Sequence, residues 1–555
     1  MLLGSQHSRL FLFGLLCVWG TAPGRVLAAE VTPERMQQAI AALKQHAGKA
    51  LADTGVPGIA IAIVHNGEVT FLNYGVREVG QPAPVTEDTV FQIASVSKPI
   101  TSTILAKLVG EGRFDWDDPV AKYDPSFRLN DPYVTAHATF RDLLSHRSGL
   151  PDHAGDLLED LGYDRAQILA RLRFFDLENR WRASYAYTNF GVTAAAQAGA
   201  LASGRKRSWE DLSQEIFYRP LGMTNTSGKF VDFVAAKNRA VGHVPADGQW
   251  FANGNWAPLF VRQPDAQSPA GGVSSTTRDL AQWVKLTLGR GYFEGQKFID
   301  PQGIGAAEAL AKQTGRNVFD LLDEQGALAE THKATMISGY DPATGQTQTY
   351  GLCWNIGSKA GQPFWSHSGE FALGARSVVG LCPKENLGIV ILVNAAPTGV
   401  PEGLQLDFFD LVLLGKVSPP PGFADWLDLS AEKFRQMTEQ NQRGDPTDFA
   451  QPPADPQPTS LPLGDFAGRY ANECYGELEV ALEGDVLVMT LGPRAAPFPL
   501  THYRGDTFFF ATQGEMQTGP SGAEFRRDAQ GVLSLTLNAY NKEGLGVFVR
   551  QPAQP

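Results

Sequence analysis

Two β-rich stretches stand far apart in the chain, and they restrict the fold more than any other feature. Residues 58–78, GIAIAIVHNGEVTFLNYGVRE, are two apolar runs around Asn66-Gly67, a pair that tolerates positive φ and therefore favours a hairpin. Residues 376–394, RSVVGLCPKENLGIVILVN, again read as strand, turn and strand. Helical and loop-rich sequence fills roughly residues 115–290 between them. We therefore expect an α+β fold in which chain segments distant in sequence close one antiparallel sheet.

The character of the sequence changes after residue 415. Proline-rich, polar stretches at 417–422 and 444–462 flank a short polar helix and predict a linker. Short alternating segments separated by turn residues follow, and they predict a small β-barrel or sandwich, of which we favour the barrel. The expected division is an export signal, a large α+β domain, a linker with a short helix, and an all-β domain, at residues 1–29, 30–415, 416–462 and 463–555.

The first 29 residues resemble an export signal. Arg9 supplies positive charge, residues 10–20 form a short apolar core, and VLAAE offers small residues for cleavage near Ala28 or Ala29. An apolar core of this length cannot span a bilayer, because a spanning helix needs about 20 residues. We expect an exported protein, periplasmic or secreted, without a membrane span.

Charge and cysteine content narrow the classes of partner. A formal net charge of −12 argues against nucleic acid, since phosphates repel an acidic surface. Cys353, Cys382 and Cys474 lie outside the export signal without CxxC spacing. A Cys353–Cys382 disulfide and buried free thiols are both open. The expected partners are a small-molecule or peptide substrate, including cell-wall fragments, and the oligomeric state is open.

The segment IASVSKPITS contains a Ser-x-x-Lys motif at Ser95 and Lys98. One helical turn separates the two side chains, so the ammonium can reach the hydroxyl. Pro99 fits the first turn of the apolar helical run that follows. The same pattern recurs as SAEK, where Ser430 is expected to cap a polar helix. On this motif alone, nucleophile and helix cap are both open for Ser95.

Two later segments complete a set of three motifs. SYAYTNFG contains Tyr187 and Asn189 in a loop-like stretch, and FWSHSGEF places His367, Ser368 and Gly369 on a predicted strand. In this order the motifs resemble the serine β-lactamase and penicillin-binding protein superfamily, in its class C-related branch with His-x-Gly. Further matching segments extend the resemblance over roughly residues 35–400; they lie at 139–152, 216–227 and 268–283.

The resemblance implies an acyl-enzyme mechanism with Ser95 as the nucleophile. Tyr187 is the implied proton acceptor, but its ordinary pKa of about 10 would have to fall toward 7, which takes about 4 kcal/mol. A Lys98 ammonium at hydrogen-bonding distance supplies about that amount at an effective dielectric near 20, and His367 adds to it when protonated. Lys98 as the base remains an open alternative.

The resemblance also assigns substrate-binding groups. Asn189 and the His-Ser-Gly strand at 367–369 would hold the substrate, and the backbone N–H groups of Ser95 and Glu370 would form the oxyanion hole. The Glu370 side chain is then free to face solvent, which we favour, or to select substrate charge. Many β-lactamases carry Lys-Thr-Gly where this chain has His-Ser-Gly. Because histidine is mostly neutral at pH 7 to 8, efficient β-lactam hydrolysis is not expected.

We therefore expect an exported serine hydrolase that cleaves amide or ester bonds. It would be a peptidase of the D-aminopeptidase or DD-carboxypeptidase kind, or an esterase. The alternative is a weak β-lactamase or a catalytically silent penicillin- or peptidoglycan-binding protein, and the sequence does not identify the scissile bond.

No cofactor or metal is expected. His146, Asp152 and His153 form a turn-rich cluster, but a zinc site requires a third ordered ligand, and packing of the loop is the favoured role. The C-terminal domain resembles the lipocalin-like accessory domain found behind some of these hydrolases, and its role is open.

Overall fold

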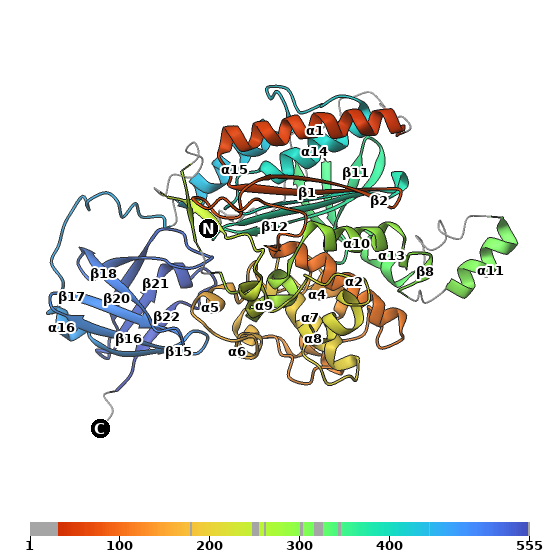
Figure 1. Cartoon of the computed structure of the whole chain (residues 1–555). Coiled ribbons are helices and arrows are strands. Elements are labelled where there is room, and N and C mark those ends of the chain that lie inside the picture. The colour runs from red at the N-terminus through yellow and green to blue at the C-terminus, as the bar shows by residue number, and fades with distance from the viewer. Residues whose placement is uncertain are drawn as a thin grey trace.

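An eight-stranded antiparallel sheet forms the centre of the larger domain (Figure 1). The computed structural model describes residues 31–177, 180–246, 255–259, 262–299, 304–315, 326–341, 346–442 and 445–552. The strand order is β2-β1-β14-β13-β12-β11-β10-β9. The strands are Gly58–His65 (β1), Glu68–Gly75 (β2), Met336–Asp341 (β9), Gln346–Tyr350 (β10), Asn355–Lys359 (β11), Gln362–Phe371 (β12), Ala375–Cys382 (β13) and Leu387–Val393 (β14). Pairing of β1 with β14 confirms the predicted closure by distant segments.

The hairpin β1–β2 forms at the predicted turn. Asn66 and Gly67 have φ of 51° and 83°, as a two-residue hairpin requires. Strand β1 is apolar throughout because both of its faces are covered. Its isoleucines contribute to one buried cluster, and its alanines with Val64 contribute to the other.

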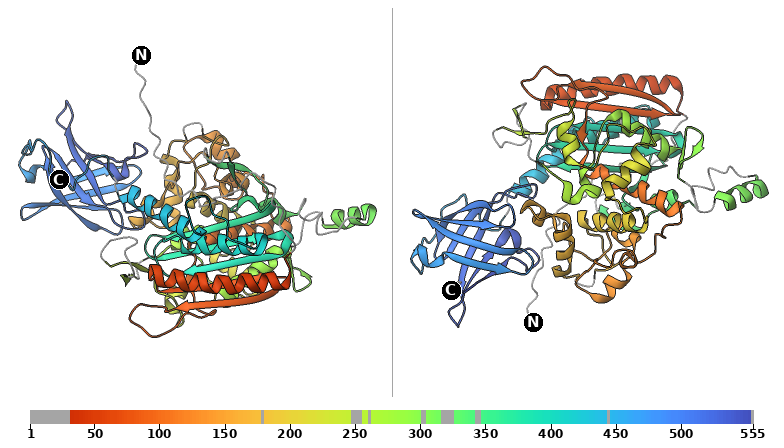
Figure 2. Two further views of the ribbon diagram at one scale, coloured as in Figure 1. Left: turned by 90° about the horizontal axis from the view of Figure 1, so that it is seen from above. Right: turned by 60° about the horizontal axis from the view of Figure 1, so that its bottom comes forward.

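Helices cover both faces of this sheet (Figures 1 and 2). Helix α14 (Val400–Leu414) packs on β13 and β14, with α1 (Pro33–Thr54) and α15 (Trp426–Gln442) beside it. On the opposite face α10 (Thr277–Leu288) contacts β1 and β14. The remaining helical layer contains α2 (Ser97–Gly110) and α7 (Asn189–Ala202), which contact each other. In the described ranges, no helix is long and apolar enough to cross a membrane.

The three cysteines in the described part of the chain, Cys353, Cys382 and Cys474, are buried free thiols. The disulfide left open by the sequence is therefore not formed. The thiols instead fill apolar positions, as unpaired buried cysteines commonly do.

The C-terminal strands form a closed eight-stranded antiparallel barrel (Figure 1). Its closure, by pairing of the first strand with the last, agrees with the predicted barrel and excludes the sandwich. The strands are Gly468–Asn472 (β15), Gly476–Glu483 (β16), Val486–Leu491 (β17), Ala496–Arg504 (β18), Thr507–Ala511 (β19), Pro520–Arg527 (β20), Leu533–Leu537 (β21) and Val547–Arg550 (β22).

The segment between the two domains is packed rather than free. Helix α15 lies on α14, and Ser430 is fully buried within it. The predicted N-cap role for Ser430 is therefore wrong, because the helix already begins at Trp426. Phe449 of the proline-rich stretch stacks on Phe509 of the barrel, with ring centroids 5.2 Å apart.

The loop between β19 and β20 joins the barrel to the larger domain. The Ala372 N–H, directly after β12, donates to Glu515 Oε1 at 2.6 Å, and Glu515 Oε2 lies 3.6 Å from Arg262 Nε. In return, Asp160 accepts the backbone N–H groups of Glu515 and Met516 at 2.9 and 2.8 Å. The barrel is therefore anchored next to the end of strand β12.

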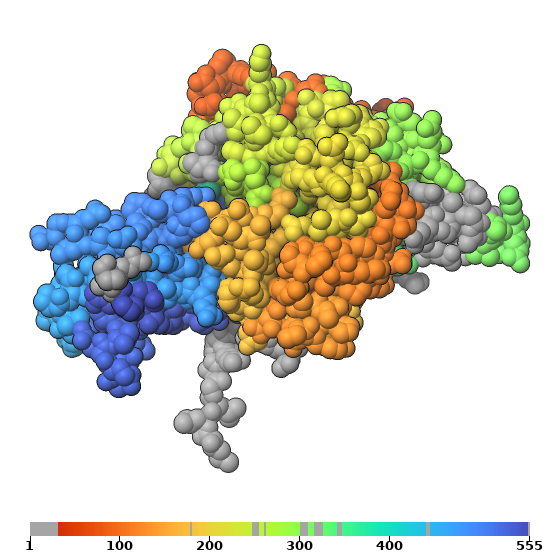
Figure 3. Space-filling model, turned by 90° about the horizontal axis from the view of Figure 1, so that it is seen from below, coloured from red at the N-terminus to blue at the C-terminus, as the bar shows by residue number. Residues whose placement is uncertain are grey.

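Helices α5 (Asp156–Asp160) and α6 (Arg165–Arg171), with the turn between them, also contact the barrel. Tyr163 donates to the Tyr475 carbonyl at 2.7 Å, and the Arg171 Nε donates to the Cys474 carbonyl at 3.0 Å. Seen from below, the barrel surface lies directly against this gold-coloured part of the larger domain (Figure 3).

The barrel contact should weaken as the pH rises. Burial raises the pKa of Glu515 to about 8, although Arg262 opposes the shift, and burial raises the pKa of Asp160 to about 6. Both groups bind protons more tightly folded than unfolded, so their stabilisation is complete at low pH and is lost as the pH rises through these values. We expect calorimetry to show a lower melting temperature at pH 9 than at pH 5.5. Glu515→Gln should reduce this difference, and an equally large fall in the variant would contradict the assignment.

Candidate active site

Ser95 stands at the N-terminal end of helix α2. It lies on a short 3-10 turn, Ala94–Val96, so the helix itself begins two residues later than the serine. Ala94 has φ of 44°, in the left-handed region that non-glycine residues rarely adopt, and packs against Phe371 of β12. This turn places the partly exposed Ser95 side chain beside the strand that carries the third motif.

Lys98 is fully buried, and its ammonium has three acceptors. Lys98 Nζ donates to Ser95 Oγ at 3.0 Å, to Asn189 Oδ1 at 2.6 Å and to the Ala270 carbonyl at 3.0 Å. Burial lowers the pKa of Lys98 to about 7, because a charge in the interior loses its hydration. The neutral amine is therefore accessible near neutral pH, and a neutral amine can accept a proton.

Tyr187 approaches the same serine from the other side. Its hydroxyl lies beside the Ser95 side chain, which acts to lower the pKa of Tyr187, and Lys98 Nζ lies over its ring, 4.5 Å from the centroid. Burial raises the pKa of Tyr187 well above 10. The expected lowering of this pKa is therefore wrong. The lysine lies against the ring face rather than at the phenol oxygen, and desolvation of a phenolate outweighs it.

The loop with His146, Asp152 and His153 holds the Tyr187 segment in place. Tyr187 N–H donates to Asp152 Oδ1 at 2.8 Å, and His153 N–H donates to the Tyr187 carbonyl at 2.8 Å. Thr188 N–H donates to His146 Nδ1 at 3.1 Å. The three residues thus have the packing contacts expected of them. In the described ranges, no group of three or more His, Cys, Asp or Glu side chains has the geometry of a metal site.

Gly369 lets strand β12 lie directly against Ser95. A Cβ built at residue 369 would lie 2.8 Å from the Ser95 nitrogen and would overlap the Ile93 carbonyl. The Ser377 hydroxyl of the neighbouring strand donates to that same carbonyl at 2.6 Å. Only a glycine permits this approach, which brings the backbone of β12 next to the serine N–H.

Gly369→Ala should therefore impair both folding and activity. The added methyl must push β12 away from Ser95, at a cost of about 1–3 kcal/mol for overpacking. We expect a lower melting temperature and a loss of turnover larger than the loss of folded protein. Gly48→Ala is the matched control, because a Cβ there meets nothing within 4 Å and alanine favours the helix. Unchanged turnover in Gly369→Ala would contradict this account of the strand.

His367 lies close to the site but is neutral and has both ring nitrogens bonded. Its Nδ1 donates to the Ser368 carbonyl at 2.7 Å, and the Tyr350 hydroxyl donates to Nε2 at 2.9 Å. Burial lowers the pKa of His367 to about 3, and the side chain is 1% exposed. His367 is therefore neutral at pH 7 to 8, as expected for a histidine, and the contribution expected of its protonated form is absent there. Its ring instead braces the β12 strand against Tyr350.

Glu370 does not face solvent, contrary to the favoured expectation for its side chain. It forms an ion pair with Arg376 on the neighbouring strand, and Arg376 also binds Glu402 at 2.5 Å. Arg376 is 4% exposed, so this charge cluster is part of the interior. The side chain of Glu370 is thereby held away from the serine, while its backbone follows Gly369.

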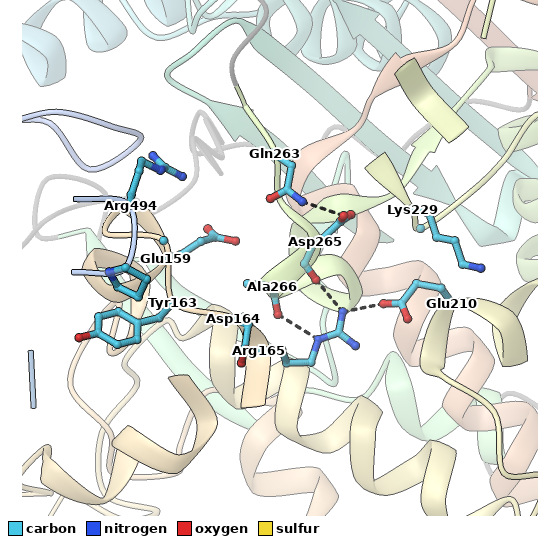
Figure 4. Close-up of a pocket in the computed structure, with 13 residues that line it drawn as sticks. Glu159, Tyr163, Asp164, Arg165, Glu210, Lys229, Gln263, Asp265, Ala266 and Arg494 are labelled. Atoms are coloured by element: carbon cyan, nitrogen blue, oxygen red, sulfur yellow. Dashed lines mark hydrogen bonds and ion pairs between the residues drawn. The ribbon is translucent and has the colours of Figure 1, made fainter. Parts of the chain in front are cut away.

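A cavity of about 660 Å³ lies at the junction with the barrel, separate from Ser95 (Figure 4). At its centre Arg165 donates to Glu210 at 2.6 Å and to the carbonyls of Asp265 and Ala266 at 2.7 and 3.0 Å. Arg494 of the barrel lies at its edge. None of the candidate catalytic side chains lines this cavity, and its central cation is already satisfied.

Several contributors to the site were not predicted. The Ala270 carbonyl belongs to the matching segment 268–283, which pointed to the region but not to a backbone oxygen. Asp156 and Tyr350 carry no motif of their own. Asp156 lies four residues after Asp152 of the His146–Asp152–His153 cluster, and this proximity is the one signal that points to it.

The fold and these three motifs define a serine hydrolase-like protein of the β-lactamase superfamily. The family model described as "Beta-lactamase" matches residues 37–409, and the chain belongs to this family. Residues 452–546, which include most of the barrel, match a model described as a domain of unknown function, DUF3471.

Relatives and solved structures resemble the chain over much of its length. "Unguisins hydrolase ungD'" of Aspergillus campestris is 25% identical over 77% of this chain and 74% of its own length. The octameric penicillin-binding protein homologue from Pyrococcus abyssi covers 92% of this chain and all of its own, with a TM-score of 0.53 and 20% identity. A β-lactamase/D-alanine carboxypeptidase from Pseudomonas syringae covers 69% of this chain and all of its own, with a TM-score of 0.52 and 18% identity.

Proposed function

We propose that the protein is an exported serine hydrolase that cleaves amide or ester bonds through an acyl-enzyme on Ser95. The observation that carries this proposal is the contact of Ser95 Oγ with the buried Lys98, whose Nζ is hydrogen-bonded within the described residues to neutral acceptors alone. The position of Tyr187 beside the same hydroxyl supports it. A serine that only caps a helix would require neither Lys98 nor Tyr187 beside its hydroxyl.

The reaction follows from these contacts. Neutral Lys98 takes the proton of Ser95 as Oγ forms a bond to the substrate carbonyl carbon. The negative oxygen that develops is stabilised by the backbone N–H groups of Ser95 and Glu370. The bond to the leaving group then breaks, and the leaving group takes the proton from Lys98 directly or through the Tyr187 hydroxyl. Water then attacks the acyl carbon and gives a proton to Lys98; the bond from that carbon to Ser95 Oγ breaks, and Lys98 returns the proton to Oγ.

Asn189 and the strand at 367–369 are proposed to hold the substrate. The Aspergillus relative is named a hydrolase, and a structural neighbour is titled a β-lactamase/D-alanine carboxypeptidase. The first name supports hydrolysis, and the neighbour's title makes peptides with D-residues the first substrate class to test. Small esters form the second class, because an ester is the less demanding acyl donor.

A substrate panel tests the proposal. D-amino-acid amides, linear peptides ending in D-alanine, p-nitrophenyl esters and nitrocefin would be compared with the purified protein. We expect multiple turnovers of at least one amide or ester and slow turnover of nitrocefin. Absence of turnover of all amides and esters would contradict the proposed activity.

The second candidate is a catalytically silent binder of penicillins or peptidoglycan. The neutral, fully bonded His367 favours it, since this strand offers no cation at that position. A penicilloyl adduct that persists for hours without product would identify the binder, whereas turnover excludes it.

Export by residues 1–29 remains a proposal, as does the lipocalin-like nature of the barrel. N-terminal sequencing of protein recovered outside the cytoplasm should begin near Ala29 or Glu30. An intact Met1 in that fraction would contradict cleavage.

A further inference from the structure

A continuous chain of hydrogen bonds leads from the candidate nucleophile to a buried carboxylate in the helix next to the barrel. Lys98 Nζ contacts Ser95 Oγ at 3.0 Å and Asn189 Oδ1 at 2.6 Å. The other end of the same amide, Asn189 Nδ2, donates to Asp156 Oδ2 at 2.8 Å. His153 Nδ1 donates to that same carboxylate oxygen at 2.6 Å.

Because these hydrogen-bonded side chains are buried, the orientation of each one affects the free energy of the site. Lys98 is 0%, Asn189 8% and Asp156 4% exposed, so water cannot replace a lost partner at little cost. A carboxylate only accepts hydrogen bonds, whereas a primary amide has one accepting and one donating end. Asp156 can therefore face only the nitrogen of Asn189, and the amide oxygen must turn toward Lys98.

We propose that Asp156 is a positioning residue that fixes the amide of Asn189 and thereby aims the lone pair of neutral Lys98 at Ser95. This inference rests on the proposed function. A neutral amine has two N–H bonds and one lone pair. Asn189 Oδ1 and the Ala270 carbonyl, both acceptors, take the two N–H bonds. The lone pair is left for the third neighbour, the Ser95 hydroxyl.

The alternative orientation shows why the carboxylate matters. With the amide of Asn189 reversed, its NH₂ group would face Lys98, and the lone pair of the amine would be drawn toward that donor. The Ser95 hydroxyl would then accept a hydrogen bond from an N–H of Lys98 instead of giving its own proton to the amine. His153 supports the productive arrangement, because its bond to Asp156 Oδ2 fixes the carboxylate that Asn189 needs.

The test measures covalent labelling of Ser95 by a fluorophosphonate and separates KI from kinact. Asp156→Asn keeps the size of the side chain but allows the amide at 156 to present either end. We expect kinact to fall about tenfold or more, with a much smaller change in KI, because the main effect is on proton transfer; a change confined to KI would contradict the inference. The final labelled fraction reports folded protein, so partial misfolding lowers the amplitude rather than kinact.

A double-mutant cycle with Asn189→Ala tests the route of the effect. If Asp156 acts through Asn189, adding Asp156→Asn to Asn189→Ala should change kinact by less than twofold. If the reductions in kinact of the two single variants multiply in the double variant, the inference is overturned. It is also overturned if kinact of Asp156→Asn lies within twofold of the unmodified protein.

Two further variants complete the design. Asp279→Asn is the matched control, since Asp279 is 2% exposed and bonds Thr226 and Asn225, away from the site. His153→Ala leaves Asp156 in place and should lower kinact several-fold; if Asp156→Asn fails to fold, an unchanged kinact in His153→Ala overturns the inference. Absence of labelling in the unmodified protein would instead contradict the proposed function itself.

Discussion

Ser95→Ala is expected to abolish covalent labelling and to reduce hydrolysis of any accepted substrate about 10,000-fold or more. The Ser95 hydroxyl is placed to form the acyl bond, because Lys98 Nζ is hydrogen-bonded to it and Tyr187 lies beside it. Without it, the remaining groups still bind substrate, but no covalent route is left. Labelling would be followed with a fluorescent fluorophosphonate and a fluorescent penicillin, and the modified residue would be identified by mass spectrometry.

Ser430→Ala is the internal control for this prediction. Ser430 and Lys433 repeat the Ser-x-x-Lys pattern, yet Ser430 is fully buried within α15 and its hydroxyl has no hydrogen-bond partner among the described residues. The substitution should leave labelling unchanged, since an unsatisfied buried hydroxyl contributes little to stability. Labelling that survives Ser95→Ala, or that disappears in Ser430→Ala, would contradict the assignment of the nucleophile.

The sheet and the order of the motifs could be predicted because they depend on short-range patterns. Asn66-Gly67 specifies its own turn, and the continuous apolar sequence of β1 reflects burial on both faces. Ser95 and Lys98 lie one turn apart whatever the rest of the chain does. Such features follow from local geometry, and a single sequence displays them directly.

The electrostatics of the site could not be predicted in the same way. The pKa of Tyr187 rises rather than falls because burial decides it, and burial is set by His146 and other residues far away in sequence. Glu370 was expected at the surface, but its pairing with Arg376 depends on strand register. Asp156 belongs to no motif, and only the fold brings it to Asn189.

Lys98→Arg is expected to reduce the rate of acylation about 100- to 10,000-fold, which is the usual contribution of a general base. An arginine remains charged at all pH values in which the protein is folded, so it cannot take the proton of Ser95. Lys107→Arg, in the last turn of the same helix, is the matched control. Its Nζ bonds the Phe298 carbonyl, away from Ser95, and its rate should stay within about twofold of the unmodified protein.

The pH dependence of acylation gives the same base a second signature. Burial lowers the pKa of Lys98 to about 7, against the opposing influence of Cys353 and Asp156. Because the base is the deprotonated amine, kcat/KM should be low below this pKa, rise by a factor of ten per pH unit, and level off above it. Besides Cys353 and Asp156, the titratable groups that interact with Lys98 include His146, His153, His367 and Tyr187.

These neighbours can be distinguished from Lys98 by the direction in which their pKa values are shifted and by the behaviour of the variants. Burial keeps His146 and His367 neutral by lowering the pKa of each, and it keeps Tyr187 protonated by raising its pKa, so none of the three gains or loses a proton near pH 7. His153 does have a raised pKa, and His153→Ala should retain the rising limb. Lys98→Arg should remove that limb together with most of the rate. A limb of unchanged midpoint in Lys98→Arg would assign the titration to another group and would exclude Lys98 as the base.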